Sequence, residues 1–222
     1  MKKLVLTVGL LLGFFWVHSQ EESIQIIDKP IVFDAQRVAL TQEYLKNRYH
    51  LDRDSITISP KMIVLHWTVI PTFNETFNAF NPAVLPSWRP ELVNVSALNV
   101  SSQFVVDRDG TIYRLMPETT MARHTIGLNH CAIGIENVGG TKDLPLTEAQ
   151  KKSNILLVSY LKKKYPSIDY LIGHYQYTQF ENHELWLEVN KGYRTEKDDP
   201  DPAFLDAVTQ GVPYTFKKTP SH

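Results

Sequence analysis

Two histidines and one aspartate are the residues of this chain whose types could hold a catalytic metal ion. His66 lies in a short apolar segment, His174 follows Gly173, and Asp199 stands in a Lys-x-Asp-Pro sequence. Two imidazoles and one carboxylate make a zinc site of the catalytic kind, because three protein ligands leave the fourth tetrahedral position open for water. Zinc lowers the pKa of that water to about 7 and polarises a carbonyl. The chemistry that these residues indicate is hydrolysis.

Each of the three residues also has a plain structural explanation. A histidine in a strand is more often a hydrogen-bonded core residue than a ligand. The carboxylate of Asp199, beside Pro200, could lie at the N-terminus of a helix, where negative charge is stabilised. The sequence around each residue decides between the two interpretations.

Five motifs follow one another in the order found in a known protein family. They are Ile63-Val64-Leu65-His66, Arg108-Asp109-Gly110, Ile133-Gly134-Ile135-Glu136, Gly173-His174 and Lys197-Asp198-Asp199-Pro200. Together they resemble the zinc amidase family that includes N-acetylmuramoyl-L-alanine amidases, phage lysozyme-type amidases and animal peptidoglycan recognition proteins. The resemblance covers Met62 to Leu205, and five ordered matches rarely arise by chance.

The resemblance implies a zinc-dependent hydrolase that cleaves the amide bond between N-acetylmuramic acid and L-alanine of peptidoglycan or muropeptides. It implies Zn²⁺ as the cofactor, with His66, His174 and Asp199 as its ligands. Two other functions stay open: a recognition module that binds muropeptides without cutting them, and an exported zinc amidase that acts on another amide. Relatives that only bind tend to lack the third ligand, so Asp199 favours catalysis. The sequence makes no prediction of oligomeric state.

Glu136 and Lys197 are the candidate catalytic residues. Glu136 ends an otherwise apolar strand, where burying a carboxylate without a purpose would be costly. We expect it to act as a general base that takes a proton from the water and passes it to the leaving amine; the alternative is a hydrogen-bond acceptor that only supports the site. Lys197 corresponds to a functional residue of the family, and its charge could stabilise the tetrahedral oxyanion. The alternative for Lys197 is an ordinary surface lysine.

Three further residues are candidates for substrate binding by resemblance. His124, in Ala122-Arg123-His124, matches a family histidine that faces the substrate, and the alternative is a structural hydrogen bond. Asn129 and His130 are weaker candidates, since the pair also suits a turn before the next strand.

The chain departs from the family pattern at three places. Asp201 replaces the glycine of the usual Asp-Pro-Gly-Pro, which alters the backbone or adds charge beside the metal. Ser102 stands where some members have a tyrosine, so a mechanism that relies on that phenol is excluded and Glu136 becomes more necessary. The segment 175–196 is longer than usual, and its aromatic residues could line a groove or simply pack together.

The sequence predicts an α/β fold in which a mixed central β-sheet is flanked by α-helices in a single domain. Strands are expected at 61–68, 103–106, 111–115, 132–138 and 168–172, and the second and third of these form a hairpin. Helices are expected after Asp34, after a capping box at Thr147 and Gln150, and from Pro202. The hairpin breaks the alternation of strand and helix, so the sheet should be mixed. The resemblance implies the fold of the amidases and peptidoglycan recognition proteins.

The beginning of the chain predicts export. Lys2 and Lys3 precede an apolar run from Leu4 to Val17. A membrane-spanning helix needs about 20 apolar residues, and this run is shorter. We expect a signal peptide at 1–19, cleavage near Ser19 and Gln20, no stable membrane insertion afterwards, and a periplasmic or secreted protein. An uncleaved anchor is the alternative. The remaining expected parts are an N-terminal extension packed on the domain (20–60), the zinc amidase catalytic domain (61–212) and a C-terminal tail (213–222).

The composition excludes some classes of partner. The formal net charge is −1, and it becomes −3 without Lys2 and Lys3. Nucleic acid is therefore not expected as a partner, because its binding normally requires a basic face. Cys131 is the only cysteine, so no internal disulfide can form, and its apolar neighbours predict a small buried side chain.

Overall fold

The computed structural model describes residues 24–87, 92 and 94–220. The predicted signal peptide lies outside the described residues, and the division of the chain at residues 60 and 212 stays a prediction. The elements in chain order are β1 (Ile26–Asp28), α1 (Ala35–Tyr49), β2 (Met62–Trp67), α2 (Phe73–Phe80), β3 (Phe104–Val106), β4 (Ile112–Arg114), β5 (Ala132–Asn137), α4 (Glu148–Lys164), β6 (Tyr170–Gly173), the 3₁₀ helix η1 (His174–Phe180) and α5 (Pro202–Gly211).

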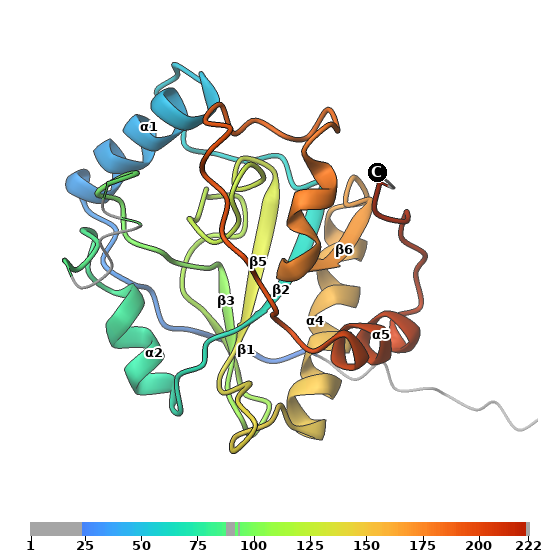
Figure 1. Cartoon of the computed structure of the whole chain (residues 1–222). Coiled ribbons are helices and arrows are strands. Elements are labelled where there is room, and N and C mark those ends of the chain that lie inside the picture. The colour runs from blue at the N-terminus through green and yellow to red at the C-terminus, as the bar shows by residue number, and fades with distance from the viewer. Residues whose placement is uncertain (1–23, 88–91, 93, 221–222) are drawn as a thin grey trace, which may run out of the picture.

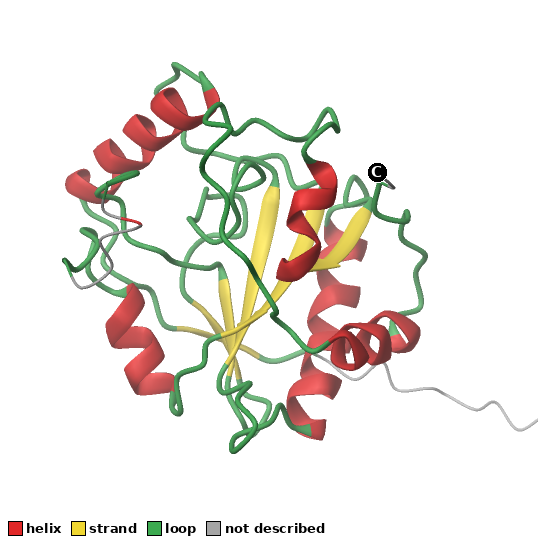
Figure 2. Ribbon diagram, in the orientation of Figure 1, coloured by secondary structure: helices red, strands yellow, loops and turns green. Residues whose placement is uncertain are grey.

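The strands form one six-stranded sheet in the order β1-β4-β3-β5-β2-β6 (Figure 1). All neighbours are parallel except β3 and β4, which form the predicted hairpin. Its turn places Gly110 at φ +90°, a conformation that glycine adopts without a steric penalty. Helices lie on both sides of the sheet, with α4 and α5 on one side and α1 and α2 on the other (Figure 2). The expected mixed sheet flanked by helices is confirmed.

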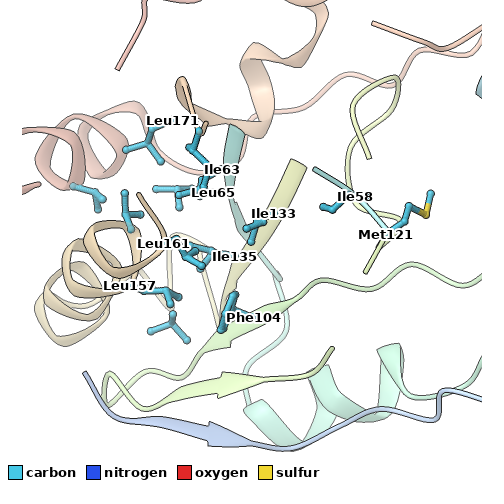
Figure 3. Packing of buried hydrophobic residues seen from close by; sticks show 14 of the residues in the cluster. Ile58, Ile63, Leu65, Phe104, Met121, Ile133, Ile135, Leu157, Leu161 and Leu171 are labelled. Carbon is cyan, nitrogen blue, oxygen red and sulfur yellow. The ribbon is translucent and has the colours of Figure 1, made fainter. Parts of the chain in front are cut away.

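Side chains alternate between the two faces of the sheet, and this alternation decides which residues reach the functional face. On β2, Ile63 and Leu65 point to α4 and α5, where they join the largest apolar cluster (Figure 3). Met62 and Val64 point the other way, into a second cluster that η1 covers. Because the side-chain period is two, His66 follows Met62 and Val64 onto this second face. Each fully buried aliphatic side chain stabilises the fold by about 1.5–3 kcal/mol.

The helices begin where the sequence predicts, with one exception. Asp34 accepts a hydrogen bond from the backbone N–H of Arg37 (3.0 Å) and caps α1. Thr147 and Gln150 form the predicted capping box of α4. Helix α2 is not among the helices expected from the sequence; Pro71 precedes it instead of interrupting it, and Thr72 caps it.

The segment before β2 packs closely on the rest of the described chain. Strand β1, which sequence patterns did not predict, adds to the sheet by pairing with β4. Helix α1 buries Tyr44, Leu45 and Tyr49, as well as the charged side chain of Arg37. The Arg37 guanidinium donates to the backbone carbonyls of Val32, Phe80, Asn81 and Pro82 at 2.6–3.0 Å. Across the described ranges, no helix has the length and apolar character to cross a membrane.

Replacing Arg37 with Met should destabilise the protein strongly. The change leaves several carbonyl groups without a donor, and each buried unsatisfied group costs about 1–3 kcal/mol, so we expect the free energy of unfolding to fall by about 2–4 kcal/mol. Arg53→Met is the control, because Arg53 makes one exposed hydrogen bond, to the carbonyl of Thr57 (3.1 Å). Urea unfolding measures both changes, and equal losses would contradict the role given to Arg37.

Candidate metal centre

The three predicted metal ligands and Glu136 converge at the carboxyl ends of adjacent parallel strands. His66 on β2 pairs in register with Glu136 on β5, and Leu65 pairs with Gly173 at the end of β6. His174 therefore follows at the level of His66. Ligands bind preferentially at this edge of open α/β sheets. The functional face is thus built by strand register alone for three of the residues.

His66, His174 and Asp199 form a compact triangle of ligand atoms. The two Nδ1 atoms are 3.0 Å apart. The Asp199 carboxylate lies 3.2 Å from Nδ1 of His66 and 3.1 Å from Nδ1 of His174. All three side chains are buried. The structure brings the predicted ligands together.

The donor set fits a tetrahedral metal ion. Ligand bonds of 2.0–2.2 Å imply ligand atoms about 3.3–3.6 Å apart, slightly more than the separations in this triangle. Burial lowers the pKa of His174 to about 4, so its imidazole is neutral and offers a lone pair. Burial raises the pKa of Asp199, but the interactions with the His174 and His66 imidazoles outweigh this effect and hold it well below its usual value. Neutral histidine and ionised carboxylate are the forms that bind metal.

The chain returns Asp199 to the site by a backbone contact. The N–H of Tyr175 in η1 donates to the Asp199 carbonyl at 3.0 Å. Asp201, the departure from the family glycine, is the N-cap of α5, and its exposed side chain accepts from the N–H of Ala203 at 2.7 Å. Asp201 thus caps the N-terminus of α5, and the Asp199 carboxylate faces the two histidines instead.

The triangle lies in a cleft of about 530 Å³ that also contains both candidate catalytic residues. Glu136 and Lys197 are half-buried and line the cleft. The charge of Lys197 contributes to the lowered pKa of His174, after burial and His66. Apolar lining comes from Val69, Ile70, Phe80, Leu85 and Leu92.

The predicted substrate-binding residues have different positions. His124 lines the cleft and its Nδ1 lies 3.0 Å from Nε2 of His66. Asn129 also lines the cleft, but its carbonyl oxygen accepts from the N–H groups of His124 (2.8 Å) and Thr125 (2.7 Å). His130 is directed to the long segment 175–196, where its Nε2 lies 2.8 Å from the Leu185 carbonyl. The structure brings His124 and Asn129 to the site and points His130 toward that segment.

The long segment both packs and lines the cleft. Trp186 stacks on Tyr177 at 6.1 Å and lies under the guanidinium of Arg194, whereas Tyr193 lines the cleft. Both alternatives left open for the aromatic residues are therefore realised by different side chains.

The Ser102 hydroxyl donates to the Phe104 carbonyl at 2.8 Å and is buried.

Tyr44 and Val69 are among the cleft residues that the sequence did not single out. Tyr44 reaches the cleft from α1, a segment without a recognised motif. Val69 lies at the cleft with φ +58°, and the residue is 59% exposed. A β-branched residue in this conformation is strained, and the strain persists only where surrounding contacts impose it. Here the N–H of Val69 donates to the Gly139 carbonyl, and the N–H of Gly139 donates to the Ile70 carbonyl, both at 2.9 Å.

A comparison with known families decides the classification. Residues 38–212 match the family described as N-acetylmuramoyl-L-alanine amidase. This chain belongs to that family. The match to the amidase family begins inside α1, upstream of the motifs that start at Met62, and ends one residue after α5.

Several solved structures resemble the chain. One is N-acetylmuramoyl-L-alanine amidase LysC from Clostridium intestinale URNW, with 24% identity, a TM-score of 0.49, and coverage of 72% of this chain and 88% of that one. Another is a selenomethionine derivative of AmpD, with 23% identity, a TM-score of 0.46, and coverage of 68% and 84%. Human PGRP-Iβ C in complex with a glycosamyl muramyl pentapeptide has 18% identity, a TM-score of 0.42, and coverage of 58% and 86%. No curated protein matches the chain.

Replacing Val69 with Gly should stabilise the amidase. Glycine adopts positive φ freely, so the substitution relieves strain of about 1–3 kcal/mol. This gain exceeds the entropic cost of ordering a glycine, which is about 0.5–1 kcal/mol. Val189→Gly is the matched control, because Val189 is also exposed but is not among the residues with positive φ. Thermal unfolding should show a higher Tm for the first variant and a lower Tm for the second. A lower Tm for both would mean that Val69 is not strained.

Proposed function

We propose that this chain is a zinc-dependent amidase that hydrolyses the bond between the lactyl group of N-acetylmuramic acid and L-alanine in peptidoglycan or muropeptides. The observation that carries the proposal is the triangle of His66, His174 and Asp199, with ligand atoms 3.0–3.2 Å apart, in a cleft that also holds Glu136 and Lys197. Membership of the amidase family supplies the substrate class.

Zinc is the metal that the donor set favours. Two imidazole nitrogens and one carboxylate suit zinc, whereas calcium and magnesium prefer oxygen ligands throughout. When bound, zinc supplies a Lewis acid for a carbonyl and hydroxide at neutral pH. His66, His174 and Asp199 would hold it, and within the described residues they are the group of side chains that could hold a metal ion.

Glu136 and Lys197 divide the remaining work. Glu136 stands beside His66 in register, which supports a role in which its carboxylate takes a proton from the attacking water and delivers it to the leaving amine. Lys197 provides a positive charge on the same cleft, where it stabilises the negative charge that develops on the carbonyl oxygen. The Ser102 hydroxyl donates to a backbone carbonyl, so Ser102 is not a candidate for this proton transfer.

Export to the periplasm or beyond is part of the proposal. It is supported by the lysines and the short apolar run at the start of the chain, which lie outside the described residues. N-terminal sequencing of protein recovered from an exporting host should find a start near Gln20. An intact Met1 on membrane-bound protein would mean that the segment is an anchor.

Variants of Glu136, Lys197 and Asp199 should separate metal binding from turnover. Glu136→Gln and Lys197→Ala should both keep zinc, because neither residue is a ligand. Turnover should fall about 10²–10⁴-fold for Glu136→Gln and about 10²–10³-fold for Lys197→Ala. Asp199→Ala should lose metal affinity as well. Metal content and the rate on a muramoyl-peptide substrate are measured for each, with the exposed Glu148→Gln as the control.

Mass spectrometry of the products identifies the bond that is cut. The proposal predicts a peptide with a new amino-terminal alanine and a sugar with a free lactyl carboxylate. Zinc-loaded protein that binds muropeptides without releasing these products would be a recognition module. A near-normal rate for Glu136→Gln would make Glu136 a structural acceptor.

A further inference from the structure

We propose that His124 is a positioning residue for the metal ligand His66. In this arrangement Nδ1 of His124 accepts a hydrogen bond from Nε2–H of His66, which fixes the tautomer in which Nδ1 of His66 offers its lone pair to the metal. The inference rests on the proposed metal site and goes beyond it, because it assigns a role to a residue that touches no metal.

The two nitrogens of His66 face different partners. Its Nδ1 belongs to the triangle with His174 and Asp199. Its Nε2, on the far side of the ring, lies 3.0 Å from Nδ1 of His124 and 3.5 Å from the hydroxyl of Thr125. A metal-binding histidine generally donates its other ring N–H to such a partner, and the partner fixes the orientation of the ring.

The contacts of His124 determine which atom carries the proton. Its Nε2 lies 3.4 Å from the Ala132 carbonyl, which can only accept, so the proton of a neutral His124 belongs on Nε2. The Nδ1 atom then carries the lone pair and must accept. Its neighbours there are Nε2 of His66 and, at 2.8 Å, the hydroxyl of Thr125. The proposal assigns this lone pair to Nε2–H of His66, the tautomer that leaves Nδ1 of His66 free for the metal.

The fold holds His124 in place from two sides. Gly134 on β5 has no side chain, and a Cβ there would lie 2.9 Å from the His124 ring, so the glycine makes room for the imidazole above the sheet. Asn129 accepts from the backbone N–H of His124 at 2.8 Å and donates to the hydroxyl of Tyr49 at 3.0 Å. A continuous set of hydrogen bonds thus joins helix α1 to the metal ligand.

A matched pair of substitutions tests the role. Asn and Leu have the same shape, but only the Asn oxygen can accept a hydrogen bond near the position of the histidine Nδ1. Zinc affinity is measured by competition with a chelator, without any substrate. His124→Leu should weaken zinc binding about 10–100-fold, whereas His124→Asn should stay close to the wild type. His183→Leu is the control, because its ring contacts Tyr170 and not a ligand.

Nitrogen NMR of the histidine rings gives a second readout. It uses the wild type, so the result does not depend on whether a variant folds. The proposal predicts that His66 of the zinc-loaded protein carries its proton on Nε2 and that His124 does so as well. Equal zinc affinities for the Leu and Asn variants, a proton on Nδ1 of His124, or a wild type that binds no zinc would each overturn it. Zinc binding with the expected tautomers but without amide hydrolysis would refute the proposed function alone.

Discussion

The register of three parallel strands is the constraint on which the rest of this site depends. Because β5, β2 and β6 pair without offset, His66, Glu136 and the residue after Gly173 arrive side by side at one edge of the sheet. A shift of one residue in β2 would turn His66 toward α4 and would bring Leu65 to the functional face. The apolar alternation that buries Ile63 and Leu65 under α4 and α5 therefore also selects the face of the metal ligand.

The remaining parts of the site come from segments that are far apart in the chain. Asp199 is placed by a backbone hydrogen bond from η1, and His124 is held by Asn129 and by the absence of a side chain at Gly134. Strain at Val69 persists beside the cleft because hydrogen bonds to the Gly139 turn impose it. Precise placement of a few polar groups thus depends on the wider fold, including the helix that precedes the first motif.

Much of this could be predicted from the sequence where the pattern was periodic or where a motif was complete. The strands that carry His66 and Glu136, the capping box at Thr147 and the three candidate ligands are of this kind. The three-residue strand β1 is too short to show alternation, and α2 was hidden by prolines that flank it. Burial of Arg37 and the contact between His130 and the long segment depend on tertiary neighbours, which spacing along the chain does not reveal.

Anomalous diffraction at the zinc absorption edge from crystals of the zinc-loaded protein tests the central claim most directly. The account predicts one peak per chain, about 2.0–2.1 Å from Nδ1 of His66 and Nδ1 of His174 and about 2.0–2.2 Å from an Asp199 oxygen. The absence of a peak among these three residues, or a zinc ion held by other side chains, would contradict it.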